Sequence, residues 1–200
     1  FIPLETEIDQ LIASCGKKTA TFLQTLKDTG ARCGEVAKLK WTDVNEKNST
    51  IAINNPEKGS SSRTIKVSTK TIAMINALPK KSDFIFNTTA RSLDSVFARQ
   101  RNRLAKTLQN PRLKQIHFHT LRHFYATMLY QKTRNILYVK QQLGHKRIES
   151  TEVYTHLIDF ESDEYHSATA KTVEEAQKLI EEGFDYVTDI EDIKLFRKRK

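Results

Sequence analysis

A tyrosine lies nine residues after a histidine in LGHKRIESTEVY (143–154), and its surroundings suggest chemistry. A phenol has an ordinary pKa near ~10, so Tyr154 is a nucleophile only with a receiving base or neighbouring cations. A phosphodiester electrophile would also need fixed positive charge at its oxygens and an acid for the departing 5′ oxygen. Arginine suits the first role because its planar fork binds two phosphate oxygens. Lysine suits the second, since neighbouring cations lower its pKa.

The sequence supplies side chains of these types in several places. They are Arg32 with Glu35 one turn later to orient it, Lys58 in a hairpin tip, His119, Arg122 and His123 at i, i+3 and i+4 of one helix, and His145 ahead of Tyr154. The spacing i, i+3, i+4 places the three middle residues on adjacent surface. We therefore expect a cationic site that brings these segments together.

Taken singly, each of these residues also has a structural explanation. Arg32 can be an ion-pair partner of Glu35, Lys58 a solvated loop residue, and Tyr154 a half-buried aromatic. His119 and His123 have the spacing of a metal pair, but no H-E-x-x-H is present. We predict no metal ligand and no cofactor, and the joint order of the segments favours the catalytic interpretation.

At these residues the chain resembles the tyrosine recombinases, the family of phage integrases and Xer-type resolvases. The matching segments are Thr29-Gly30-Ala31-Arg32 with Glu35, Lys58-Gly59 with Arg63, His119-Thr120-Leu121-Arg122-His123, and Leu143-Gly144-His145 with Tyr154. They occur in the family order over roughly residues 1–160. The resemblance implies a DNA recombinase or integrase that cuts and rejoins strands through a covalent 3′-phosphotyrosyl link, without metal or ATP.

The resemblance also implies a role for each residue. Tyr154 is the nucleophile, Arg32 and Arg122 stabilise the phosphorane, Lys58 is the general acid, His119 assists proton transfer, and His145 bonds a phosphate oxygen. Glu35 and His123 are supporting residues, and His123 is either an accessory site residue or a helix-packing residue. Two other functions stay open: a type IB topoisomerase, and a catalytically silent DNA-binding accessory protein.

The sequence departs from the family pattern in its hairpin loop and before Phe1. KGSSSRTIKV (58–67) lacks the second basic loop residue often found in relatives. The N-terminal helical DNA-binding domain of the family is absent before Phe1, so we expect the catalytic domain to fall short of a full recombination cycle alone. The resemblance implies a tetramer as the working assembly on DNA.

Charge is divided unevenly along the chain. The net charge is +9, and residues 1–160 carry 26 Lys and Arg against 13 Asp and Glu, whereas 161–200 carry 7 against 11. Double-stranded DNA therefore leads the expected partners. Two cysteines without metal spacing, no apolar run of ~20 residues and no signal peptide predict a cytoplasmic protein without a membrane partner.

Hydrophobic periodicity predicts a mainly α fold with a small antiparallel β-sheet (α+β). Helices are expected at 3–15, 18–29, 34–40, 69–78, 91–108, 119–131, 134–143 and 149–158. Alternation at 49–54 and 63–68, around a Pro-, Gly- and Ser-containing tip, predicts a β-hairpin, and 83–86 a third strand. On the helix at 91–108, Arg99, Arg103 and Lys106 share one face, and with Arg63 they are the candidate DNA-binding residues.

The C-terminal tail, 161–200, is expected to be distinct from the catalytic domain at 1–160. An acidic amphipathic helix is predicted at 171–182, followed by a β-hairpin at 184–200 with its turn near Glu191-Asp192. The tail either docks on another molecule or caps the core, and the resemblance implies docking in trans on a neighbouring protomer. The sequence leaves both open.

Overall fold

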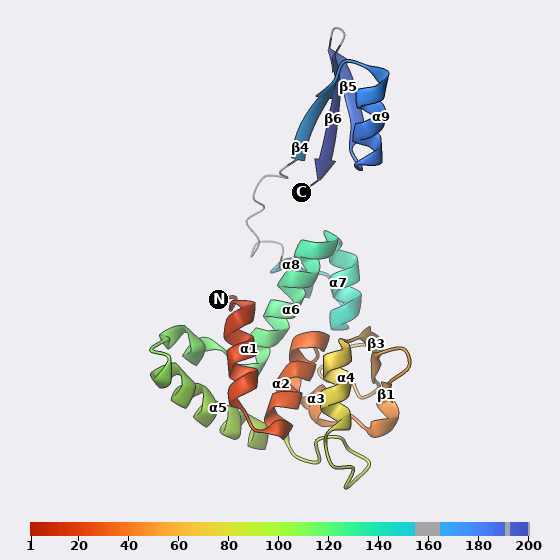
Figure 1. Cartoon of the computed structure of the whole chain (residues 1–200). Coiled ribbons are helices and arrows are strands. Elements are labelled where there is room, and N and C mark those ends of the chain that lie inside the picture. Colours follow the sequence, from red (N-terminus) through yellow and green to blue (C-terminus); the bar gives the residue numbers. More distant parts are fainter. Residues whose placement is uncertain (155–164, 191–192, 200) are drawn as a thin grey trace. The chain divides into compact units, whose positions relative to one another are not determined.

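The computed structural model describes residues 1–154, 165–190 and 193–199. The chain forms two compact units, Phe1–Ile158 and Asp159–Lys200. Figure 1 shows that the first unit consists mostly of helices and that the second is a small sheet with one helix. The expected mainly α architecture with small antiparallel sheets is confirmed.

The first unit is built around one buried helix. Its helices are α1 (Glu5–Ser14), α2 (Lys17–Thr29), α3 (Cys33–Ala37), α4 (Thr69–Asn76), α5 (Ala90–Thr107), α6 (Phe118–Thr133), α7 (Ile136–Leu143) and α8 (Glu149–Glu152), with short 3-10 turns η1 (Trp41–Asp43) and η2 (Pro111–Gln115). Helix α2 contacts α1, α4, α5 and α6. Since it has neighbours on several sides, even its Thr19, Gln24 and Thr25 are buried.

Aromatic rings connect the helices that carry the candidate site. The Phe22 ring lies 5.0 Å from that of Phe86 and 5.2 Å from that of Phe118, which stacks on Phe97 at 5.4 Å between centroids. Such pairs contribute about 0.5–1.5 kcal/mol beyond the burial of their area. The first turn of α6, which precedes Arg122, is therefore fixed against both α2 and α5.

The expected hairpin is present, but the prediction of a third strand at 83–86 is wrong. Strands β1 (Val44–Asn45), β2 (Thr50–Ile53) and β3 (Arg63–Lys66) form an antiparallel sheet in the order β1-β2-β3, with Ile51 opposite Ile65. Residues 83–86 make a single bridge, between Lys40 and Phe84, instead of a strand. Their apolar side chains Ile85 and Phe86 are buried, so this segment anchors a loop in the core.

The second unit is a three-stranded sheet with one helix. Strands β4 (Tyr165–Ala170), β5 (Asp185–Ile190) and β6 (Ile193–Arg199) are ordered β4-β6-β5, and helix α9 (Val173–Glu181) contacts β4. Ala170, Ala176 and Phe196 form its buried core. The expected helix and hairpin strands are present, but the expected turn at Glu191-Asp192 lies outside the described residues. Sequence patterning missed β4.

None of the helices in the described ranges has both the length and the apolar character that a membrane span requires.

Gly30 provides a test of how the fold depends on backbone conformation. It ends α2 in the left-handed region at φ 58°, and a Cβ there would lie 2.3 Å from Cδ1 of Tyr125. We expect Gly30→Ser to lower the free energy of unfolding by about 1–3 kcal/mol, measured by urea denaturation. Gly16→Ser is the matched control, because Gly16 caps α2 at φ −64° with no atom within 4 Å of its added Cβ. Equal losses in the two variants would contradict the explanation.

Candidate active site

Arg122 is a buried cation whose guanidinium joins three segments of the first unit. It is 2% exposed on α6. Its Nη1 donates to the Gly30 carbonyl at 2.6 Å, and its Nη2 donates to the Leu143 carbonyl at 2.9 Å and to Nε2 of His145 at 2.8 Å. Burial and then the nearby Arg32 lower the Arg122 pKa to about 10, so the group stays charged at neutral pH. The site therefore contains a fixed, oriented cation before any ligand arrives.

His145 is held on both ring nitrogens. Since Arg122 can only donate, Nε2 of His145 must accept, and the neutral ring then carries its proton on Nδ1. Nδ1 lies 2.9 Å from Oγ1 of Thr151 and donates a hydrogen bond to that oxygen. Burial, followed by Arg122 and Arg32, lowers the pKa of His145 to about 4. The ring is therefore neutral in the unliganded protein at pH 7.

The chain reaches His145 through a glycine that no other residue replaces easily. Gly144 ends α7 at φ 70°, and a Cβ there would lie 2.8 Å from Nη1 of Arg63 and 2.9 Å from the Ser61 carbonyl. The Gly144 carbonyl accepts from the Ser61 amide at 3.0 Å. Helix α7 and the hairpin loop thus approach each other closely enough for both to border one site.

Glu35 organises the other side of the site. Its buried carboxylate accepts from the Arg32 amide at 2.9 Å, from the Glu57 amide at 3.2 Å and from Nη2 of Arg63 at 2.8 Å. Burial raises the pKa of Glu35, but Arg63 and the backbone donors outweigh it and the pKa is lowered overall. The carboxylate therefore stays ionised and fixes Arg32 at the start of α3.

Lys58 is placed beside Arg32 by the residues on either side of it. Nη1 of Arg32 donates to the Glu57 carbonyl at 3.2 Å and to Oγ of Ser60. Lys58 itself has a positive φ of 50° and is exposed. The loop backbone is thus fixed by Arg32 and Glu35, while the lysine side chain projects from it.

Two adjoining hollows collect five of the six expected catalytic residues. One, of about 150 Å³, is lined by residues that include Arg32, Lys58, His119 and Arg122. The other, of about 250 Å³, is lined by residues that include Arg32, Lys58 and His145. Arg32 and Lys58 border both, so the cations face a shared space. This arrangement has the fixed positive charge that a phosphate group requires.

Tyr154 lies behind this space instead of within it. Its side chain is 3% exposed, packs with Ala126, Val139 and Leu143, and lines neither hollow. Burial raises the pKa of Tyr154, and the fields of Arg122 and Arg32 oppose that rise. Attack on a phosphate in the hollows requires the phenol to turn outward.

Two histidines of α6 lie between the hollows and Tyr154. The ring of His119 is 4.5 Å from that of His123, which is 5.5 Å from the ring of Tyr154. Burial lowers the pKa of both histidines, and Arg122 lowers them further. Nδ1 of His123 is buried and has no hydrogen-bond partner in the described part of the chain. His123 thus packs beside the tyrosine, consistent with either role left open for it.

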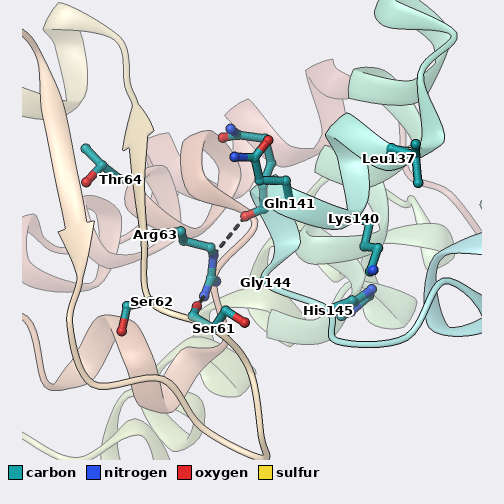
Figure 2. Close-up of a pocket in the computed structure, with 10 residues that line it drawn as sticks. Ser61, Ser62, Arg63, Thr64, Leu137, Lys140, Gln141, Gly144 and His145 are labelled. Atoms are coloured by element: carbon teal, nitrogen blue, oxygen red, sulfur yellow. Dashed lines mark hydrogen bonds between the residues drawn. The ribbon is translucent and has the colours of Figure 1, made fainter.

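Arg63 occupies a different position from the one expected for a DNA contact. Its side chain is 5% exposed, and besides Glu35 it donates from Nε to the Gln142 carbonyl at 2.8 Å. Figure 2 shows the Arg63 side chain reaching from β3 toward α7. It lines a hollow of about 410 Å³ together with residues of both elements. Arg63 therefore connects the hairpin to the end of α7. Arg99, Arg103 and Lys106 are exposed on α5 and line neither catalytic hollow.

Several residues that the sequence interpretation missed also line or support the site. Ser60 is a hydrogen-bond partner of Arg32, and Thr151 is a partner of His145. The hollow of about 250 Å³ is also lined by Lys146, Arg147 and Ser150. The cations follow L-G-H directly, so their position next to a named motif was an available signal. Among the described residues, no three His, Cys, Asp or Glu side chains form a group that could hold a metal.

Arg63→Ala tests whether this arginine supports the fold. Removing it leaves the buried Glu35 carboxylate without its closest cation, so we expect a loss of roughly 3 kcal/mol in the free energy of unfolding. Chemical denaturation measures this. The control is Arg99→Ala at an exposed position, with an expected change within about 0.5 kcal/mol. An Arg63 variant as stable as wild type would show that the pair is not needed.

The neutral state of His145 predicts a pH dependence of stability. The unfolded chain takes up a proton on this residue near pH 6.5, whereas the folded protein does so only near pH 4. The unfolded state therefore binds more protons between these values, and stability falls as pH drops through this window. Between pH 7 and pH 5, we expect the free energy of unfolding to fall less in His145→Gln than in wild type, by on the order of 1 kcal/mol. Denaturation at each pH measures this. The same loss in both proteins would contradict the assignment.

Comparison with known proteins identifies the family. The model of the phage integrase family matches residues 4–160. A probable integrase/recombinase of Methanocaldococcus jannaschii is 29% identical over 151 residues, which cover 70% of this chain and 46% of that protein. Tyrosine recombinase XerA of Saccharolobus solfataricus is 27% identical over 161 residues, which cover 77% and 51% respectively. The chain spans about half the length of these curated relatives.

Solved structures agree with this result. The catalytic domain of bacteriophage HP1 integrase is similar with a TM-score of 0.60 at 29% identity, over 80% of this chain and 89% of that one. A crystal structure of XerA recombinase is similar in fold, with a TM-score of 0.65 at 24% identity over 80% of this chain and 61% of that one. On the family match over residues 4–160, the chain belongs to the phage integrase family.

Proposed function

We propose that this chain cuts and rejoins DNA strands as a tyrosine-type site-specific recombinase or integrase, with Tyr154 as nucleophile. The observation that carries the proposal is the convergence of Arg122, Arg32, Lys58 and His145 on one space beside a buried tyrosine. Fixed cations of this kind stabilise developing charge because they need no rearrangement during the reaction. The curated relatives that are named tyrosine recombinases support the same chemistry.

In each step of the proposed reaction, one bond to phosphorus forms, another breaks, and a proton is transferred. The Tyr154 oxygen forms a bond to phosphorus while the bond from phosphorus to the 5′ oxygen breaks, and the charge on the phosphorane lies between Arg32 and Arg122. His119 assists removal of the phenol proton, and Lys58 protonates the departing 5′ oxygen. The 5′ hydroxyl of a partner strand then reverses these steps at the same phosphorus. The phosphotyrosine retains the energy of the broken bond, so neither ATP nor a metal takes part.

Charge supports duplex DNA as the partner. Residues 1–160 carry twice as many basic as acidic side chains. The exposed cations Arg99, Arg103 and Lys106 offer backbone contacts outside the hollows, and we expect DNA affinity to fall steeply with salt. In this proposal the protein acts in the cytoplasm, and four copies assemble on DNA. Residues 1–160 form the catalytic domain, and the tail at 161–200 is a separate appendage.

A covalent-complex assay tests the proposal. The protein is incubated with a nicked duplex carrying a cognate site in the presence of EDTA, and products are separated on a denaturing gel. We expect a protein–DNA band that disappears in Tyr154→Phe, because only the phenol oxygen can form the phosphotyrosyl bond. Tyr138→Phe, which alters a tyrosine 41% exposed on α7, is the matched control and should keep the band.

Other outcomes separate the alternatives. DNA binding without a band from any variant would favour the catalytically silent accessory protein. Relaxation of supercoiled plasmid without exchange between two sites would favour type IB topoisomerase activity. Equal bands from wild type and Tyr154→Phe would exclude Tyr154 as the nucleophile.

A further inference from the structure

A continuous hydrogen-bonded path leads from the buried arginine to the turn that carries the tyrosine. Nη2 of Arg122 lies 2.8 Å from Nε2 of His145, and Nδ1 of His145 lies 2.9 Å from Oγ1 of Thr151. The Tyr154 amide then donates to the Thr151 carbonyl at 3.0 Å. Thr151 is fully buried, and its own amide donates to the Ile148 carbonyl at 2.7 Å. One residue thus contacts both the phosphate-facing histidine and the segment that carries the nucleophile.

The direction of these hydrogen bonds must change when a phosphate binds. In the unliganded protein Nε2 of His145 accepts from Arg122, so Nδ1 carries the proton and donates a hydrogen bond to Oγ1 of Thr151. A phosphate oxygen can only accept, so His145 must present a proton on Nε2 to bind it. A neutral ring then has a bare Nδ1, which needs a donor. The partner of Nδ1 must therefore accept in one state and donate in the other.

A threonine hydroxyl meets this requirement because it has one proton to donate and two lone pairs that accept. The charged groups that act on His145 cannot take its place. Arg122, Arg32 and Arg63 only donate, and Glu35 is held by its own donors. A doubly protonated ring would donate from both nitrogens and would leave Thr151 an acceptor, but burial and the three guanidiniums disfavour that ring.

We propose that Thr151 is a positioning residue that lets His145 change tautomer on phosphate binding and couples that change to the turn carrying Tyr154. The inference rests on the proposed function. In the change, the ring releases its Nδ1 proton to solvent and gains one from solvent on Nε2, so its charge stays the same. The Thr151 hydroxyl rotates from acceptor to donor. Its backbone carbonyl meanwhile holds the Tyr154 amide, so the two events share one residue.

Kinetics of covalent-complex formation test this role. Thr151→Val keeps the shape but removes the hydroxyl. We expect the cleavage rate to fall by about 10- to 100-fold, the size of loss seen when a residue that orients a metal-binding histidine is removed. DNA affinity should change less than about 2-fold, since ion pairing with the backbone dominates affinity. Thr151→Ser restores a hydroxyl and should return the rate to within about 3-fold of wild type.

Two controls separate positioning from packing. Thr25→Val makes the same change at a fully buried threonine of α2, whose hydroxyl donates to the Thr21 carbonyl, and should leave the rate unchanged. In a double-mutant cycle, Thr151→Val should add no further loss once His145 is alanine. Equal loss in the valine and serine variants, or a full further loss in the double variant, would overturn the proposal.

Nitrogen-15 NMR of the His145 ring tests the tautomer change without any cleavage. In free Tyr154→Phe protein we expect the proton on Nδ1, and on binding to a duplex oligonucleotide we expect it on Nε2. The same experiment with Thr151→Val added should show a weakened or absent change. A ring that keeps Nδ1 protonated on bound DNA overturns the proposal, even if wild type cleaves. If wild type forms no covalent complex while the tautomer still changes, the proposed function fails and only the role of Thr151 in the tautomer change stands.

Discussion

The first unit depends on how it satisfies one buried positive charge. A guanidinium removed from water is costly unless its donors are paired, and Arg122 finds its acceptors in two backbone carbonyls and one imidazole. The acceptors come from Gly30 just after α2, from Leu143 at the end of α7, and from His145 two residues beyond that end. Gly30 and Gly144 adopt positive φ at these two ends. The hydrogen bonds that offset the cost of burying Arg122 therefore also bring the ends of α2 and α7 together.

A buried anion performs the matching task on the hairpin side. Glu35 accepts from Arg32, Glu57 and Arg63, so it sets the start of α3, the hairpin tip and the base of β3 together. Arg63 extends this network to the end of α7 through the Gln142 carbonyl. The two networks meet at Gly144, where hairpin and helix touch. The cationic face is thus rigid because both of its borders are held by charged hydrogen bonds.

Much of the architecture followed from the sequence, and the failures share a cause. Apolar periodicity located most helices of the first unit and the hairpin, because the residue types show which face is buried. The helix expected over 149–158 ends at Glu152, and residues 155–158 lie outside the described residues. The strand predicted at 83–86 is wrong because buried apolar residues such as Ile85 and Phe86 occur both in strands and in loops that anchor to the core. Motif order indicated which side chains would converge. It did not indicate that Arg63 would be buried or that Thr151 would bond His145, since these partners are fixed by tertiary contacts and by backbone carbonyls that any residue supplies.

The burial of Tyr154 alongside preformed cations implies a division between fixed and movable parts. A phenol packed against aliphatic side chains is held protonated, because burial disfavours the phenolate more than Arg122 and Arg32 favour it. The guanidiniums of Arg122 and Arg32, by contrast, are already held by hydrogen bonds to neighbouring segments. A phosphate entering the hollows would compete with Nε2 of His145 for Arg122, and the donors released would pass to the phosphate oxygens. In the proposed reaction, the energy for turning Tyr154 outward would come from phosphate binding at the cations, so the phenol would be exposed mainly when its target is present.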